Sequence, residues 1–166
     1  IAGNLSEYGP VAETIFQKYN IPLFLDQGRS SLGKPIFAFV QSALRIISPE
    51  RYFRREDLLA FLKTGLCGED RDLISRLENY CILWQVSGER FLREADWTQN
   101  PKGMGKPDEE ALETLAELNA LRKRICAPLL RMKEAVGETG ASLAEAIYQL
   151  LCDFKVEEQM ASVAQG

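Results

Sequence analysis

Residues 107–136 read PDEEALETLAELNALRKRICAPLLRMKEAV, the longest stretch of the chain with apolar residues at helical spacing. Apolar side chains recur every three or four residues, which predicts an amphipathic helix over 108–136 with one buried stripe. The stripe is formed by Leu112, Leu115, Leu118, Arg122, Ile125, Leu129, Met132 and Val136. Acidic residues directly after Pro107 suit the positive end of a helix dipole, and Pro128 is expected to kink the helix. A helix roughly 40 Å long, at about 1.5 Å per residue, indicates a fold built on helices.

Shorter helical patterns precede and follow this stretch. Residues 35–47 are apolar on most sides, which is typical of a helix at the centre of a core. Further helices are expected at 54–63, 71–84 and 142–151, with a last helical turn at 156–163. Ser142 and Glu145 are spaced as a capping box at the start of one of them. Between residues 86 and 106 the helical spacing is lost, and a loop of that length is usually functional or mobile.

The first residues of the chain read as a helix followed by a strand. Pro10 suits the first turn of a helix, and residues 21–25 (IPLFL) are a short apolar run closed by turn residues. Pro22 cannot donate a hydrogen bond within a sheet, so it needs the beginning of a strand or an edge strand. The expected fold class is therefore mainly α, a multi-helix domain with a short N-terminal helix–strand piece.

Length and charge limit the class of protein to which the chain belongs. Its 166 residues suit one domain, or one domain and a fragment of a second. The formal net charge of −4 lacks the basic surplus with which a stand-alone nucleic-acid binder neutralises phosphates, so any DNA contact must be local or assisted. No apolar run is long enough to span a bilayer, so no membrane role is expected. The first residues, IAGN, are neither a signal sequence nor a natural start, and we expect a segment of a longer protein.

The four cysteines, at positions 67, 81, 126 and 152, form no C-x-x-C pair, and the chain contains no histidine. The usual zinc-binding spacings are therefore absent. Cys81, Cys126 and Cys152 fall in apolar helical patterns and are expected to pack as small hydrophobic residues. Cys67, beside Gly68, is the candidate for an exposed thiol. This cysteine usage indicates a reducing, cytoplasmic setting.

The residues that enzymes most often use are scarce. Without histidine, the commonest general base and the usual partner of a nucleophilic Ser or Cys is missing. The sequence GMGK at 103–106 is too short to cradle a triphosphate and is interpreted as a mobile loop. Acidic residues that suggest a magnesium site are interpreted as a solvated helix start, because Asp70 and Asp72 point to different helix faces. The acidic residues are Asp57, Glu69, Asp70, Asp72 and Glu78. We therefore expect neither catalytic nor metal-binding residues in this chain.

One cluster of basic residues suits nucleic acid. Arg54 and Arg55 follow Arg51 closely, and Lys63 lies at the far end of the same predicted helix. Aromatic residues 52–53 (YF) are interleaved with them, an arrangement typical of nucleic-acid contacts. The predicted DNA contacts are Arg54, Arg55 and Lys63, which would hold phosphates rather than read bases. The alternative is an ordinary solvated helix face. The basic residues interpreted only as surface or stem-packing residues are Arg45, Arg122, Lys123 and Arg124.

The order of these pieces resembles a known family. The resemblance is carried by residues 8–10 (YGP), 21–26 (IPLFLD), 42–44 (SAL), 62–66 (LKTGL), 77–80 (LENY) and 118–122 (LNALR). A helix, a strand, a turn and an apolar helix resemble the place in superfamily 1 helicases where a strand leaves the second RecA-like motor domain and enters a helical insertion. The motifs themselves are most similar to the AddB family of bacterial AddAB helicase–nucleases, and their order extends across nearly the whole chain.

The resemblance implies a domain organisation and a function. Residues 1–28 would be the edge of the RecA-like second domain, and residues 29–166 a helical accessory insertion domain. The domain would be non-catalytic within an ATP-dependent helicase and deoxyribonuclease that acts in double-strand break repair and recombination. It would position DNA, or dock on other domains of the parent chain and on the AddA-like motor subunit. ATP, Mg²⁺ and an iron–sulfur cluster would be cofactors of the parent, with none held by this segment.

A second hypothesis does not involve DNA. The acidic charge balance and the long helix at 108–136 also suit a helical protein–protein interaction module, because the apolar stripe of such a helix can dock a partner helix. DNA retention by the chain at low salt distinguishes the two hypotheses.

Overall fold

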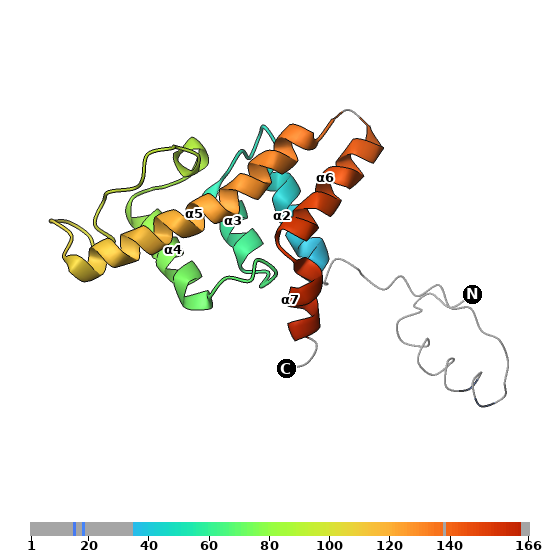
Figure 1. Ribbon diagram of the computed structural model, residues 1–166, viewed down its shortest axis with the longest axis horizontal. Coiled ribbons are helices and arrows are strands. Elements are labelled where there is room, and N and C mark those ends of the chain that lie inside the picture. The colour runs from blue at the N-terminus through green and yellow to red at the C-terminus, as the bar shows by residue number, and fades with distance from the viewer. Residues whose placement is uncertain (1–14, 16–17, 19–34, 138, 164–166) are drawn as a thin grey trace. The chain divides into compact units, whose positions relative to one another are not determined.

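The computed structural model describes residues 15, 18, 35–137 and 139–163 of the 166-residue chain. By its contacts the chain divides into two units, Ile1–Leu32 and Gly33–Gly166, and the following helices belong to the second. They are α2 (Pro35–Ile47), α3 (Arg55–Leu62), α4 (Arg71–Leu83), the short 3₁₀ helix η2 (Gly88–Phe91), α5 (Glu109–Ala135), α6 (Gly140–Asp153) and α7 (Val156–Val163) (Figure 1). The described residues form no strand, and the predicted mainly α class is confirmed. The predicted strand at 21–25 and nearly all of the N-terminal helix lie outside the described residues, and the domain boundary at residue 28 stays a prediction.

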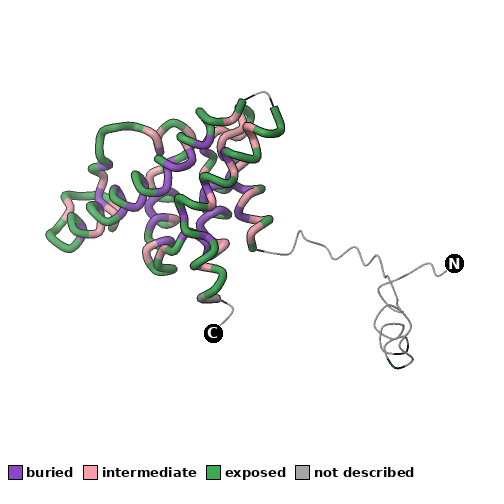
Figure 2. The backbone as a smooth tube through the Cα atoms, turned by 45° about the vertical axis from the view of Figure 1, so that its right-hand side comes forward, coloured by how far each residue is buried: buried purple, intermediate pink, exposed green. Residues whose placement is uncertain are grey.

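Helix α5 is the central support of this unit. Asp108 caps its amino end by accepting a hydrogen bond from the backbone amide of Ala111 at 2.8 Å. The helix continues through Pro128 and packs against α2, α4 and α6, so that buried and exposed positions alternate along it (Figure 2). Leu112 of the predicted stripe is half exposed, because Ala111 faces the core at this turn instead. None of the described helices, α5 included, is both long enough and apolar enough to cross a membrane.

Aromatic rings from three parts of the unit meet in its core. Phe39 of α2 and Phe61 of α3 are fully buried, with ring centroids 4.3 Å apart. Phe154, at the carboxyl end of α6, meets these rings edge-on at 5.6 and 5.4 Å. Aromatic pairs gain about 0.5–1.5 kcal/mol from such geometry in addition to the apolar area that they bury. The three rings therefore join the first helices of the unit to its last ones.

The long loop between α4 and α5 is present as predicted, and side chains of both helices hold it. Asn119 of α5 accepts a hydrogen bond from the Trp97 backbone amide at 2.8 Å and donates to the Trp97 carbonyl at 3.1 Å. Nε1 of Trp84 donates to the carbonyl of Asn100 at 3.0 Å. The Trp97 ring stacks on Tyr80 of α4 with centroids 4.9 Å apart. The loop therefore has a defined packing of its own, because its buried backbone polar groups need partners that no regular element supplies.

Arg122 of α5 also holds this loop from a buried position, and its interpretation as a surface or stem-packing residue is wrong. Its side chain is 1% exposed. Nη1 donates to the carbonyl of Arg93 at 2.8 Å and Nη2 to the carbonyl of Ala95 at 3.1 Å. The guanidinium lies 4.9 Å from the centre of the Trp97 ring, a cation–π arrangement. The side chain thus supplies donors to loop carbonyls that would otherwise be unpaired.

Two of the four cysteine predictions are wrong. Cys67 is buried, because Gly68 with φ +69° turns the chain, and the Cys67 Sγ lies 3.8 Å from the carbonyl of Phe61. Cys152 is exposed, because it lies two residues beyond the buried Leu150 and therefore on the outer face of α6. Apolar helical spacing indicated the helix correctly in this case, but not the face on which the thiol lies.

The other two cysteines, Cys81 and Cys126, are buried as predicted. Burial raises the pKa of each thiol to about 12, because a thiolate loses its hydration in the core. All four cysteines of the chain are free. The buried thiols are therefore protonated and unreactive near neutral pH.

Helix α6 begins earlier than the sequence predicted. Thr139 is its N-cap, and the Thr139 hydroxyl accepts a hydrogen bond from the Ser142 backbone amide at 3.1 Å. The Ser142 hydroxyl donates to the Thr139 carbonyl at 2.8 Å and accepts from the amide of Gly137 at 3.1 Å. The predicted capping box of Ser142 and Glu145 is therefore wrong, because Ser142 already lies in the first turn.

Candidate nucleic-acid interface

The predicted basic cluster begins in the connection between α2 and α3. Arg51 forms a bidentate contact with Asp57, with Nε 2.7 Å from one carboxylate oxygen and Nη2 2.9 Å from the other. The Asp57 side chain is only 5% exposed, and its hydrogen bond raises the pKa of Arg51. Bidentate arginine–carboxylate pairs are geometrically specific, so Arg51 fixes this connection rather than offering a free charge.

The aromatic residues next to Arg51 are also committed to the fold. Phe53 is fully buried with φ 47°, its amide donates to the Ile46 carbonyl at 2.9 Å, and its carbonyl accepts from Gly88 at 2.8 Å. Phe53 therefore cannot stack on a base, and the expectation that it supports nucleic-acid contacts is wrong. The ring of Tyr52 is half-buried, and the Lys133 ammonium of α5 lies 4.1 Å from its centroid.

Arg54 is the residue of the cluster that the fold leaves available. It is the N-cap of α3, with backbone angles in the extended region, and its side chain caps no amide. The side chain is exposed and forms no hydrogen bond or ion pair with the residues that the structure describes. An exposed guanidinium of this kind can hold a phosphate without first breaking an internal contact.

Arg55 is largely used by the fold. Its Nη1 donates to the Cys81 carbonyl at 3.4 Å, its Nη2 lies 3.0 Å from Glu56, and its side chain is 24% exposed. Nη1 of Arg90 donates to the Trp84 carbonyl at 2.8 Å and to the following carbonyl at 3.0 Å. Two arginines thus cover the carboxyl end of α4, where unpaired carbonyls and the negative end of the helix dipole favour cations.

Lys63 lies at the opposite end of α3, where it is the C-cap residue. Its ammonium pairs with Glu78 of α4, with 2.8 and 2.7 Å to the two carboxylate oxygens. Arg54 and Lys63 are separated by the length of the helix, roughly 13 Å at 1.5 Å per residue. The three predicted DNA contacts therefore differ in what surrounds them. Arg54 is exposed and has no ion pair with the described residues, Arg55 is held at the carboxyl end of α4, and Lys63 forms an ion pair with Glu78.

Two basic residues near this cluster were missed by sequence reasoning. Arg90 joins Arg55 at the end of α4, and Lys133 reaches Tyr52 from the far end of α5. Burial raises the pKa of the Cys81 thiol, and the nearby charges of both arginines act in the opposite direction. No local pattern connects these residues with the cluster, because they come from distant parts of the chain.

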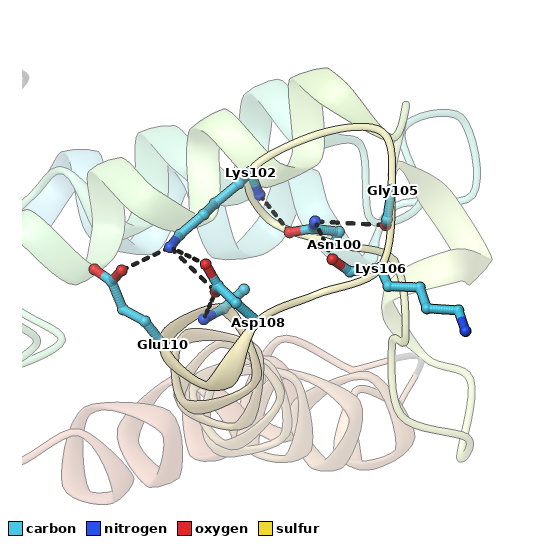
Figure 3. Close-up of polar contacts among 7 residues, drawn as sticks. Asn100, Lys102, Gly105, Lys106, Asp108 and Glu110 are labelled. Carbon is cyan, nitrogen blue, oxygen red and sulfur yellow. Dashed lines mark hydrogen bonds and ion pairs between the residues drawn. The ribbon is translucent and has the colours of Figure 1, made fainter.

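The loop that contains GMGK is shown in Figure 3. Asn100 donates to two carbonyls of the loop at 3.5 and 3.4 Å and accepts from the Lys102 amide at 2.9 Å. The Lys102 ammonium lies 2.9 Å from Asp108 and 2.6 Å from Glu110, and its hydrogen bond lowers the pKa of Asp108. The side chain of Lys106 extends away from the other labelled residues. The loop is thus closed by internal contacts, and its charges do not converge on a place where a phosphate could bind.

Each acidic residue considered as a magnesium ligand has a structural partner. The Asp70 side chain caps α4 by accepting from the amides of Asp72 and Leu73 at 3.0 and 3.1 Å. The ion pairs are Asp57 with Arg51, Glu69 with Arg124, Asp72 with Arg76, and Glu78 with Lys63. In the part of the chain that the structure describes, no three His, Cys, Asp or Glu side chains lie close enough together to hold a metal ion. The four cysteines likewise do not fit an iron–sulfur cluster, which needs several thiolates at one place.

Comparison with known proteins identifies one group of relatives. No protein-family model matches the chain. A protein of Acetivibrio thermocellus is 32% identical over 164 residues, one of Ruminiclostridium cellulolyticum is 31% identical over 163, and one of Clostridium kluyveri is 29% identical over 165. The names of all three describe the B-type subunit of an ATP-dependent helicase/deoxyribonuclease.

The similarity covers almost all of this chain and little of its relatives. The matched residues make up 95–96% of the chain, and the chain spans 14% of the length of each of these proteins. The resemblance to the AddB family is therefore confirmed: over nearly its whole length, the chain is similar to one segment of the B-type ATP-dependent helicase/deoxyribonuclease subunits.

Proposed function

We propose that the chain is a helical accessory domain of an ATP-dependent helicase/deoxyribonuclease subunit and has no catalytic residues of its own. The observation that carries the proposal is the match of nearly the whole chain to one segment of proteins with that name. In this proposal residues 29–166 are the accessory insertion domain and residues 1–28 are the edge of a RecA-like motor domain. ATP, Mg²⁺ and an iron–sulfur cluster would be bound by other parts of the same polypeptide.

The proposal includes the partners of the parent protein. It would assemble with an AddA-like motor subunit, and it would process DNA ends during double-strand break repair and recombination in the cytoplasm. The name of the relatives, a subunit of a helicase and deoxyribonuclease, supports the partner subunit and the DNA. The free cysteines, one of them exposed, support a reducing compartment.

Within such a protein, the geometry favours a rigid support with one local DNA contact. Most basic side chains of the candidate interface are engaged by carboxylates, carbonyls or an aromatic ring. Arg54 alone among the three predicted contacts is exposed and without such a partner in the described part of the chain. Its guanidinium would hold a phosphate and so position DNA without reading its sequence.

The test is the salt dependence of DNA binding by the assembled parent protein. In the variant Arg54→Glu, the slope of log binding constant against log salt concentration should decrease by about 0.9 if one phosphate contact is lost. Lys106→Glu is the matched control, since Lys106 is an exposed lysine outside the cluster and the change in net charge is the same. Equal slopes for the two variants would remove the DNA contact and favour the protein–protein interaction module.

The non-catalytic part of the proposal has its own test. The 166-residue chain should neither hydrolyse ATP nor cleave DNA when Mg²⁺ and either substrate are supplied. ATP hydrolysis or DNA cleavage that co-purifies with the chain through separate chromatographic steps would contradict the accessory role.

A further inference from the structure

An apolar groove lies where α2, α6 and α7 meet. It has a volume of about 590 Å³ and its floor is formed by Ile36 of α2, Leu151 of α6 and Val156 of α7. Tyr148 and Met160 line its sides and are 68% and 40% exposed. Figure 1 shows the three helices next to one another at the end of the unit that is remote from the α4–α5 loop. The groove is therefore built by regular helices and not by a loop.

Large apolar side chains are exposed at the groove. Tyr148 and Met160 are among the few large hydrophobic residues exposed in the described part, and both line the groove. Exposed apolar side chains that gather in a groove and are rimmed by charged residues suit a docking site.

Charges at the rim indicate the chemistry of the occupant. Two carboxylates, Glu157 and Glu158, and one ammonium, Lys155, line the groove, and Glu157 has no ion pair with the residues that the structure describes. Glu158 lies 3.7 Å from Lys155, but both side chains are about 70% exposed, so this pair is weak. An occupant with apolar side chains and a lysine or arginine next to them would complement both the floor and the rim.

The connectivity indicates where the occupant comes from. Helix α7, which ends at Val163, is the last described helix, and it forms one wall of the groove. The relatives extend far beyond the matched segment, since the chain spans only 14% of their length. A segment of the same polypeptide reaches this groove at a high effective concentration, because a covalent connection replaces a bimolecular encounter.

We propose that this groove binds an amphipathic helical segment of the same longer polypeptide, which places apolar side chains between α2, α6 and α7 and a lysine or arginine against Glu157. The inference rests on the proposed function, because it requires that the chain is a domain of such a polypeptide. Helix-in-groove recognition uses anchors at i, i+3 or i+4 and i+7, and the adaptable Met160 suits such a surface. Docking would hold the accessory domain in a fixed orientation.

Photo-crosslinking in the longer polypeptide tests this proposal. With Tyr148→p-benzoyl-phenylalanine, irradiation and peptide mass spectrometry should give one main cross-linked peptide, which lies outside residues 1–166 and contains apolar residues and a lysine or arginine. Leu112→p-benzoyl-phenylalanine is the control, since Leu112 is 52% exposed on α5, away from the groove. A cross-link within residues 1–166, to the motor subunit, or to a second copy of the polypeptide would overturn the proposal, as would no cross-link. Mixed isotopic labelling identifies the second copy.

Cys152 provides an independent readout, because it lines the groove and is exposed in the described unit. In the longer polypeptide, Glu157→Lys should speed iodoacetamide labelling of Cys152 about tenfold, because a docked segment protects the thiol in proportion to its occupancy. Glu113→Lys, an exposed position on α5, should leave the rate unchanged. Absence of labelling at the buried Cys81 and Cys126 verifies that the variant is folded. Equal rates of Cys152 labelling in the two variants would contradict the contact between the docked segment and Glu157. A changed salt dependence of DNA binding in Arg54→Glu would still support the proposed function in that case.

Discussion

At the scale of single residues, Arg122 has the largest expected effect on stability. Its buried guanidinium donates hydrogen bonds to the carbonyls of Arg93 and Ala95 and lies against the Trp97 ring. Arg122→Met keeps the apolar stem but leaves buried carbonyls without donors, so the free energy of unfolding should fall by about 3–5 kcal/mol. Urea unfolding followed by circular dichroism measures this loss.

The neighbouring Lys123 provides the matched control for Arg122. Its ammonium pairs with Asp96 at 2.7 Å, and both side chains are more than half exposed. Exposed ion pairs contribute about 0–1 kcal/mol, so Lys123→Met should change the free energy of unfolding by less than about 1 kcal/mol. Similar losses in the two variants would show that burial of Arg122 has little energetic weight.

The buried thiols predict how stability depends on pH. Cys81 and Cys126 have folded-state pKa values of about 12, against 9.0 for a free thiol. Their contribution to stability is therefore complete below pH 9 and is lost as the pH rises from 9 towards 12, since the unfolded chain then binds fewer protons. Between pH 8 and 10 the free energy of unfolding should fall by about 1 kcal/mol for each of the two thiols.

Urea titrations at pH 8, 9 and 10 measure this dependence. The double variant Cys81→Ala, Cys126→Ala should show a flatter decline between pH 9 and 10, whatever its stability at pH 8. An unchanged decline in the double variant would assign the pH dependence to other groups, such as the buried Tyr80, whose pKa is raised to about 12.

The burial of Arg122 could not be predicted from the sequence, and the reason is specific. Arg122 occupies an apolar stripe position, and an arginine there normally extends its charge to solvent along an apolar stem. Its hydrogen-bond acceptors are carbonyls 27 to 31 residues earlier in an irregular loop, and no residue type or spacing marks them. When a side chain donates to a backbone carbonyl, the residue that supplies the carbonyl can be of any type, so the sequence does not mark it.

At the scale of elements, the carboxyl end of α4 depends on arginines from two other segments. Arg55→Gln removes one of these contacts and should lower the free energy of unfolding by about 1 kcal/mol. Arg54→Gln should change it by less than about 0.5 kcal/mol, because the exposed Arg54 side chain forms no hydrogen bond or ion pair with a described residue. Hydrogen exchange of the last amides of α4 should accelerate only in Arg55→Gln. Faster exchange in both variants would contradict the division between a structural and an available arginine.

Helix positions were predictable because they depend on local spacing and punctuation. The apolar run at 35–47 coincides with α2, and the stretch 108–136 brackets α5, since proline and acidic caps mark these boundaries directly. The start of α6 was misplaced because Thr139 and Ser142 are both good caps, and the structure uses the earlier one. The candidate site was less predictable, because ion pairs such as Lys63 with Glu78 join residues that only the folded chain brings together.

At the scale of the whole described unit, many basic side chains form ion pairs with carboxylates of the same unit. Lys63, Arg76 and Arg124 each pair with a carboxylate of another segment, and Arg51 holds the connection before α3. Many basic side chains of the described unit are therefore neutralised by a nearby carboxylate, in a chain whose 20 basic residues are outnumbered by 24 acidic ones. The same unit exposes an apolar groove at one end, so its outward functions are expected from a few positions, Arg54 and the groove, and not from overall charge.

The stacking of Trp97 on Tyr80 determines what tryptophan fluorescence can report about this molecule. The chain has two tryptophans, and both, Trp84 and Trp97, belong to the loop region beside α4. Their emission therefore senses detachment of the loop and is blind to events at α6 and α7. If the groove end loosens first on heating, far-ultraviolet ellipticity will fall while the indole signal is still constant, and the gap between the two curves will measure how independently the ends melt.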